Sequence, residues 1–247
     1  MGLDANLYDP AEHARVARDV ARPANQLRNA LVDLGLAFRT VRPRTRGHRI
    51  DRGRFVTSAL RRDPRILISR VRVPTNDLFV GVCVDCSGSM NGERMERARQ
   101  FATLLAVACQ GLPSVDLRTF GFTDSTLYDA GTASRSAAHA LRAGGGNNDA
   151  AALHHVAGLA RRSPRDAKLL VMISDGLPTE CSSTSLIALV KRLEREGMAC
   201  AQVAVARIRE PCFDHYVEVL GADSSDVVRR FGRIVQGLVA ATLRGSR

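Results

Sequence analysis

The stretch VGVCVDCSGSM, Val80–Met90, begins as an apolar run and ends in small polar residues. Such a run, followed by a turn, is typical of a strand that is buried on both faces of a parallel sheet. The run stops at Asp85, and Ser87 and Ser89 follow at alternate positions with Gly88 between them. A buried strand does not itself need a carboxylate and two hydroxyls at its end. We therefore expect a binding site at this point of the chain.

Strands and helices alternate after this stretch. Apolar runs predict strands at residues 78–84, 115–122, 126–129, 168–174 and 199–208, and helical periodicity predicts helices from residue 93 onward, at 134–141, 149–161, 182–196 and 225–243. This alternation indicates an α/β fold with a doubly wound, mostly parallel sheet and helices on both faces. Aromatic residues make up only 4% of the chain, so the core must be mainly aliphatic, as suits such a sheet.

The N-terminal part of the chain has a different character. Residues 11–38 have helical periodicity, which Pro23 should interrupt or divide. The segment Arg39–Arg72 holds twelve arginines and two acidic residues, and within it Arg65–Val73 alternates apolar and basic residues as an edge strand does. We therefore divide the chain into a helical, arginine-rich N-terminal extension, residues 1–76, and an α/β domain, residues 77–247.

The chain is strongly basic. Its 36 Lys and Arg residues against 25 Asp and Glu residues give a formal charge of +11 and an isoelectric point near 10.4. The arginines of residues 39–72 either cover a solvated surface, dock an acidic protein or neutralise the phosphates of a nucleic acid. Phe55 is the one aromatic residue in that segment, so base stacking has little support there.

The six cysteines show no repeated metal-binding spacing. Cys83 and Cys86 are spaced as C-x-x-C, but positions three apart on a strand point to opposite faces, so they should share neither a zinc ion nor a disulfide. The N-terminal sequence MGLDANLYDPAEH lacks a signal-peptide pattern, and no apolar run approaches 18 residues. We therefore expect a reduced, cytoplasmic protein without a membrane span.

Three loops carry polar residues that packing does not require. They are the end of the first core strand, the glycine loop GGGNND and the turn ISDG, with Asp85, Ser87, Ser89, Asn147, Asp149 and Asp175. The first two groups could merely cap a helix, and a strand that ends in Asp-Gly is common in α/β proteins. However, sites of parallel sheets lie at the carboxyl ends of the strands, so the three loops should meet. Carboxylates and hydroxyls without nearby His or Cys suit Mg²⁺ or Mn²⁺, so the sequence predicts a site for one of these ions.

The motif DCSGS, the glycine loop and MISDG together resemble a von Willebrand factor A (vWA) domain with a metal-ion-dependent adhesion site. The resemblance covers roughly residues 77–247. It implies a Rossmann-like sheet flanked by helices, and a divalent ion with an open position for a partner's carboxylate. It assigns Asp85, Ser87 and Ser89 as ligands from the first loop, and Asp175 as the ligand from the third.

The second loop departs from that pattern. Asn147 stands where the family usually has Thr. The sequence N-x-D of Asn147–Asp149 instead resembles the variant in cobaltochelatase-type subunits and nitric-oxide-reductase activation proteins. This favours Asp149 as the ligand, and Asn147 stays a candidate ligand or neighbour. A third carboxylate would strengthen cation binding and make the metal less electrophilic.

The sequence GHRIDRGRF, Gly47–Phe55, resembles the arginine-rich lead-in of the cobaltochelatase-type subunits. The candidate partner-binding residues are therefore Arg44, Arg46, Arg49, Arg52 and Arg54. In that group the domain acts beside a MoxR-like or chelatase-type AAA+ ATPase that inserts or activates a metal centre. These 247 residues contain no phosphate-binding G-x-x-x-x-G-K-S/T, so any ATPase is a separate chain. The resemblance thus implies a non-enzymatic, Mg²⁺-dependent adaptor.

Two other functions stay open. An RNA- or DNA-binding protein would use the arginine-rich segment. The other is a metal-dependent phosphohydrolase. Asp85 could act as a phosphoryl acceptor, but Ser87 stands where such enzymes have a second Asp. Ser87 could act as a nucleophile, but no His is placed to activate it. His154 and His155 diverge by about 100° on a helix and so should not share an ion. His48 has no evident partner.

Overall fold

The computed structural model divides the chain into two units. It describes residues 1–5, 7–34, 36–44, 49–52, 55–61, 63–64, 67–74, 78–176, 178–208, 210–220 and 224–245. Met1–Leu34 and Asp77–Arg247 form the first unit, called the vWA unit after the resemblance of its motifs, and Gly35–Asn76 form the second, the arginine-rich unit. Our sequence-based division at residue 76 differs from this grouping in the placement of residues 1–34.

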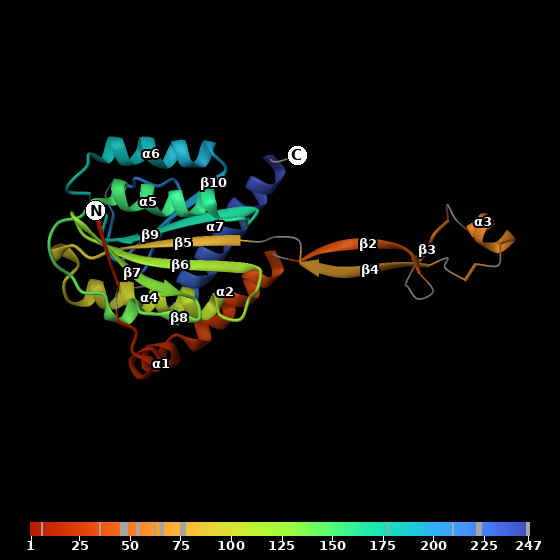
Figure 1. The fold of residues 1–247 in the computed structure, drawn as a ribbon, viewed down its shortest axis with the longest axis horizontal. Coiled ribbons are helices and arrows are strands. Elements are labelled where there is room, and N and C mark those ends of the chain that lie inside the picture. The colour runs from red at the N-terminus through yellow and green to blue at the C-terminus, as the bar shows by residue number, and fades with distance from the viewer. Residues whose placement is uncertain are drawn as a thin grey trace. The chain divides into compact units, whose positions relative to one another are not determined.

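The vWA unit is built on one sheet with the strand order β1-β7-β6-β5-β9-β10-β11, and β8 pairs with β7 (Figure 1). The strands are β1 (Gly2–Ala5), β5 (Leu78–Asp85), β6 (Val115–Phe122), β7 (Thr126–Thr132), β8 (Arg135–Ser136), β9 (Ala167–Ser174), β10 (Met198–Ala204) and β11 (Tyr216–Glu218). Neighbours from β6 to β11 are parallel, while β7 is antiparallel to β6. The predicted mostly parallel sheet is confirmed.

Helices cover both faces of this sheet (Figure 1). Helices α5 (Asp149–Arg162) and α6 (Ser183–Arg195) cover one face, and α2 (Ala21–Leu34), α4 (Glu93–Cys109) and α7 (Ser224–Gly245) cover the other. Alternate residues of β5 belong to the two cores, with Val80 and Val82 on the α4 side and Phe79 and Cys83 on the α5 side. A strand buried on both faces explains the continuous apolar run.

The N-terminal helices pack as part of the vWA unit. A single residue, Val20, separates helix α1 (Pro10–Asp19) from α2, so the predicted interruption near Pro23 is confirmed. Ala24 and Leu27 of α2 are buried in the same core as Phe231 of α7. Burial of these apolar side chains, rather than their place in the sequence, joins residues 1–34 to the sheet.

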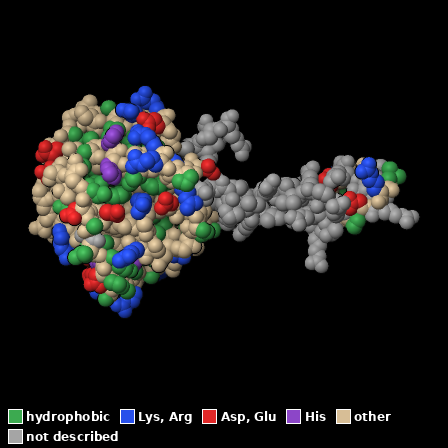
Figure 2. Space-filling model, in the orientation of Figure 1, with side chains coloured by type: hydrophobic (Ala, Val, Ile, Leu, Met, Phe, Trp, Pro, Cys, Tyr) green, Lys and Arg blue, Asp and Glu red, His purple; other side chains and the backbone are tan. Residues whose placement is uncertain are grey.

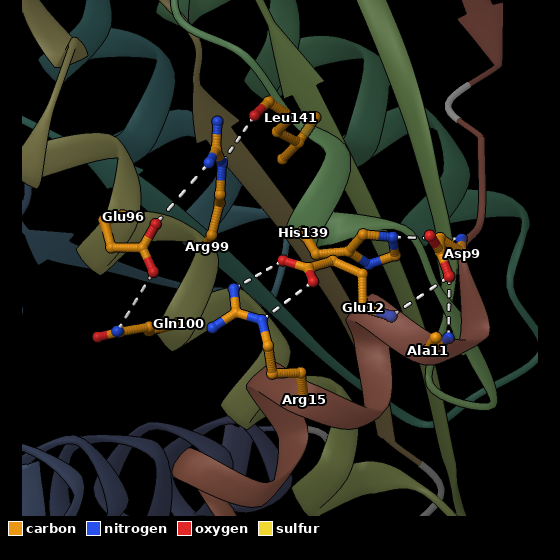
Figure 3. A network of polar contacts seen from close by, with 9 residues as sticks. All are labelled: Asp9, Ala11, Glu12, Arg15, Glu96, Arg99, Gln100, His139 and Leu141. Carbon is orange, nitrogen blue, oxygen red and sulfur yellow. Dashed lines mark hydrogen bonds and ion pairs between the residues drawn. The ribbon is translucent and has the colours of Figure 1, made fainter.

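Polar contacts fix helix α1 beside the short 3₁₀ helix η2 (Ala138–Ala140) (Figure 3). The side chain of Asp9 caps α1 by accepting hydrogen bonds from the backbone N–H groups of Ala11 and Glu12. The backbone N–H of Asp9 donates to Nε2 of His139 at 3.2 Å. The N-terminal segment is thereby hydrogen-bonded to a loop 130 residues further along the chain.

Three expectations about secondary structure were wrong. Helix α2 ends at Leu34, short of residue 38, and the chain continues as a strand from Leu36. Residues 134–141 form β8 and η2 instead of a helix, because Arg135 and Ser136 pair with Thr132 and Gly131 in a hairpin that uses their backbone groups. The strand expected at residues 199–208 ends at Ala204.

The arginine-rich unit contains its own antiparallel sheet. Its elements are β2 (Leu36–Arg44), β3 (Arg49–Ile50), α3 (Phe55–Leu60) and β4 (Leu67–Pro74). Strand β4 lies between β2 and β3, so the expectation of an edge strand at residues 65–73 was wrong.

The five candidate partner-binding arginines all lie in the arginine-rich unit. Arg44 lies in β2, Arg49 in β3, and Arg52 is exposed at a turn. Arg46 and Arg54 lie outside the described residues, as does His48. Their role in partner binding stays a prediction. None of the helices in the described ranges of the chain is both long and apolar enough to cross a membrane.

Candidate metal centre

The first loop and the glycine loop are hydrogen-bonded to each other at the carboxyl end of the sheet, and the third loop follows the strand next to β5. Asp85 is the last residue of β5, and Asp175 follows the last residue of the neighbouring parallel strand β9. The backbone N–H of Gly88 donates to the carbonyl of Gly145 at 2.8 Å, and that of Gly144 donates to the carbonyl of Cys86 at 2.7 Å. The first loop and the glycine loop therefore meet, as the fold rule predicts.

The first loop is shaped by the side chain of Asp85, which is fully buried. Its Oδ1 accepts a hydrogen bond from the backbone N–H of Ser87 at 2.8 Å. The hydroxyl oxygens of Ser87 and Ser89 lie 3.0 Å apart, so both hydroxyls are on the same side of the loop. The D-x-S-x-S spacing thus gathers one carboxylate and two hydroxyls.

Asn147 joins the first loop to the segment after β9. Its Nδ2 donates to Oδ2 of Asp85 at 3.2 Å. Its Oδ1 accepts from the backbone N–H of Thr179 at 2.6 Å and from the Thr179 hydroxyl at 2.8 Å. The backbone donor fixes which amide atom is the oxygen. The oxygen of Asn147 therefore already has two donors, which favours a supporting role for Asn147.

Asp149 begins helix α5 and is 2% exposed. Its Oδ2 is buried without a hydrogen-bond partner among the described residues. Burial, and then repulsion from Asp85 and Asp175, raise the pKa of Asp149 to about 7. Burial and the charge of Asp175 also raise the pKa of Asp85, against the hydrogen bonds from Ser87 and Asn147. The three carboxylates are close enough to repel one another.

Asp175 is bound by a residue that sequence reasoning missed. Nη1 of Arg94, near the start of α4, donates to Oδ2 of Asp175 at 2.8 Å and to the carbonyl oxygen of Ser89 at 3.0 Å. Neither Arg94 nor Thr179 belongs to a motif. Only the folded arrangement of the loops shows that they lie here.

The donor types fit a small hard cation. A buried carboxylate oxygen without a donor, next to other carboxylates, is the environment that a divalent ion would satisfy. In the described parts of the chain, no three His, Cys, Asp or Glu side chains stand close enough to hold a metal ion by themselves. The hydroxyls of Ser87 and Ser89, with water, would have to complete the coordination. The ligand set of the sequence analysis stays a prediction.

The cysteines and histidines form no group of three or more metal-binding side chains in the described parts of the chain. Cys83 and Cys86 are both buried and free, and they belong to the two different cores, so their opposite orientation is confirmed. His154 and His155 are exposed on α5, and the ring of His155 contacts Phe120.

A Rossmann-like sheet of this topology, with its polar loops at the carboxyl ends of β5 and β9, defines a vWA domain. The chain matches the model of a family described as "VWA domain containing CoxE-like protein" over residues 24–225. It belongs to this family.

Several solved structures are similar to this chain at low identity. The PilB minor pilin of Streptococcus sanguinis (D319A mutant) is 11% identical with a TM-score of 0.53, over 72% of this chain and 66% of the pilin. The SpRpn10 VWA domain is 15% identical with a TM-score of 0.48, over 62% and 94%. The manganese-loaded Plasmodium vivax TRAP protein is 16% identical with a TM-score of 0.46, over 65% and 74%.

This chain spans 22–66% of the lengths of the pilus-protein structures that it resembles. No curated protein matches it. With a TM-score of 0.53 at 11% identity, the similarity to the PilB minor pilin supports the fold alone.

Proposed function

We propose that this vWA domain is a non-enzymatic adaptor that binds a protein partner through a Mg²⁺- or Mn²⁺-dependent site. The observation that carries the proposal is the buried Oδ2 of Asp149, which has no hydrogen-bond donor in the described structure and lies among repelling carboxylates. The residues that would hold the ion are Asp85, Ser87, Ser89, Asp149 and Asp175. When bound, the ion supplies a position that accepts a carboxylate of the partner.

The partner in this proposal is a separately encoded AAA+ ATPase of the MoxR or chelatase type, and the role is metal-centre insertion or activation of a protein complex. Membership of the CoxE-like family and the resemblance of the N-x-D loop support this role. The absence of a phosphate-binding motif from the 247 residues is consistent with an ATPase on another chain.

Co-precipitation with a purified candidate ATPase tests the proposal. We expect a complex in Mg²⁺ that is lost with EDTA and in Asp85→Ala. Asp166→Ala is a matched control, because Asp166 is exposed and precedes β9 at the opposite end of that strand. A complex that is indifferent to EDTA and to Asp85→Ala would remove the ion from the function. Phosphoester cleavage by the protein alone, lost in Asp175→Ala, would instead indicate the hydrolase.

Nucleic-acid binding by the arginine-rich unit is a second candidate function. Its support is the concentration of twelve arginines against two acids in Arg39–Arg72. On the face of the vWA unit that Figure 2 shows, basic and acidic side chains are interspersed instead of forming one basic patch. We expect any binding of a generic oligonucleotide to weaken steeply with salt. A salt slope near zero would exclude this function.

A further inference from the structure

Arg94 contributes a permanent positive charge to the candidate metal centre. One nitrogen of its guanidinium, Nη1, contacts both the carboxylate of Asp175 and the carbonyl of Ser89. It therefore links the first and third loops from helix α4. The Asp175 side chain is 11% exposed, whereas that of Arg94 is 46% exposed. The contact is made by a group that reaches in from solvent.

The neighbouring arginines of α4 do not make this contact. Arg97 pairs with Glu93 on its own helix, and Arg99 donates to the carbonyl of Leu141 and pairs with Glu96. The ion pair with Asp175 therefore depends on the position of Arg94 and not on the general basicity of the helix. Arg97 provides a matched control because it has the same charge on the same helix.

We propose that Arg94 is a built-in counter-cation, which competes with the divalent ion for Asp175 and swings into solvent when the ion binds. The inference rests on the proposed function of the site. A guanidinium cannot ligate a metal ion, and two cations that share one carboxylate repel each other. The release of Arg94 is inexpensive because its side chain is already half in solvent, so no buried charge is left without a partner.

The exchange has a consequence for the partner. In the metal-free protein Arg94 occupies Asp175 and is not available. Once released, it is a free guanidinium near the ion, and the pair of cations would recognise an acidic side chain of the partner. Binding of the ion would thus break the ion pair between Arg94 and Asp175 and leave the guanidinium of Arg94 free to contact the partner.

Titration calorimetry with Mn²⁺ on the full chain tests the competition, with Arg94→Gln, Arg97→Gln and Asp149→Asn as variants. Removal of a unit charge close to a divalent ion in a water-like dielectric should change the affinity by about tenfold. We expect Arg94→Gln to bind Mn²⁺ about tenfold more tightly than wild type, Arg97→Gln to match wild type, and Asp149→Asn to lose binding. If Arg94→Gln binds Mn²⁺ and the affinity of the wild type is too weak to measure, the result also supports the competition.

Equal or weaker binding by Arg94→Gln, with wild type binding normally, would overturn the role of Arg94 and leave the metal site intact. Absence of Mn²⁺ binding from wild type and Arg94→Gln alike would overturn the metal site and this inference together. The release of Arg94 is measured by a separate experiment. Phenylglyoxal should modify Arg94 faster when Mn²⁺ is present, as followed by peptide mass spectrometry, while the rate of modification of Arg97 stays constant. An unchanged rate at Arg94 would refute the release.

Discussion

The ionised side chain of Asp149 destabilises the metal-free folded protein. Its pKa is raised from 3.8 to about 7 in the folded state, first by burial and then by Asp85 and Asp175. Between these two values the folded state binds more protons than the unfolded state, so the free energy of unfolding falls as pH rises through this window. We expect Asp149→Asn to weaken this dependence, leaving the contribution of Asp85, whose pKa is also raised by burial, and to stabilise the metal-free protein by roughly 2 kcal/mol near pH 8. Urea unfolding near pH 5 and pH 8 measures both effects.

The same variant reports on the ion. Added Mg²⁺ should raise the free energy of unfolding of the wild type, because ligand binding to the folded state alone stabilises it. Asp149→Asn should show no such gain, and Asp166→Asn, at the other end of the sheet, should behave as wild type. A destabilised Asp149→Asn near pH 8 would show that the carboxylate has a partner that favours its charge.

Strand β5 and helix α5 approach so closely that glycine is required at position 81. A Cβ on Gly81 would lie 2.3 Å from Cγ1 of Val156. We expect Gly81→Ala to push α5, which begins with Asp149, away from the strand and to cost about 1–3 kcal/mol of stability. Adding Val156→Ala should recover part of this loss, whereas Val156→Ala alone should destabilise by leaving a cavity. Thermal unfolding of the three variants measures the coupling, and strictly additive losses would contradict the close contact.

Helix α1 is attached through a neutral histidine. Nε2 of His139 accepts the N–H of Asp9, so a proton on that nitrogen would break the contact (Figure 3). Burial lowers the pKa of His139 despite the nearby charges of Asp9 and Glu12, and Arg142 adds to the effect. Burial, with His139, also lowers the pKa of His13, whose ring is 6.2 Å from that of His139.

In the unfolded chain His139 has the ordinary histidine pKa of 6.5. The stabilisation by neutral His139 is therefore complete above pH 6.5 and declines as the pH falls below it. We expect hydrogen exchange in α1, corrected for its intrinsic pH dependence, to accelerate as the pH falls from 6.5 to about 5. His139→Gln keeps an acceptor without a titrating proton and should flatten the profile. His154→Gln, at an exposed position on α5, is the control and should leave it unchanged. A pH-independent exchange rate in the wild type would exclude the mechanism.

Elements with strong local patterns were predictable, and contacts between distant segments were not. The apolar run of β5 and the position of Asp85 at its end follow from strand periodicity alone. The bridge from Asn147 to Thr179 joins residues 32 apart, and the pair of Arg94 with Asp175 joins residues 81 apart. No rule of sequence spacing predicts either contact. The failed helix at residues 134–141 has the same cause, because pairing with β7 overrode the local preference.

The vWA unit is continuous in space although the arginine-rich unit interrupts it in sequence. Residues of α2 complete the core on the α4 face of the sheet, so the N-terminal helices belong to the structure that positions the candidate metal site. Within the arginine-rich unit, Leu36, the first residue of β2, pairs with Pro74, the last residue of β4. Its first and last strands therefore begin and end as neighbours, which is the geometry of an insertion.

Removal of residues 35–76 should thus be tolerated. We expect replacement of this segment by a short Gly-Ser linker to change Tm by no more than about 2 °C and to leave Mn²⁺ affinity at the wild-type value, because short loop closures cost little. Deletion of residues 1–34 should instead lower stability by several kcal/mol, since it uncovers the core around Ala24 and Leu27. Scanning calorimetry of both variants measures the two changes in stability. A large loss of Tm on removing 35–76 would mean that this segment stabilises the vWA unit, and retained partner binding would exclude its arginines as the docking surface.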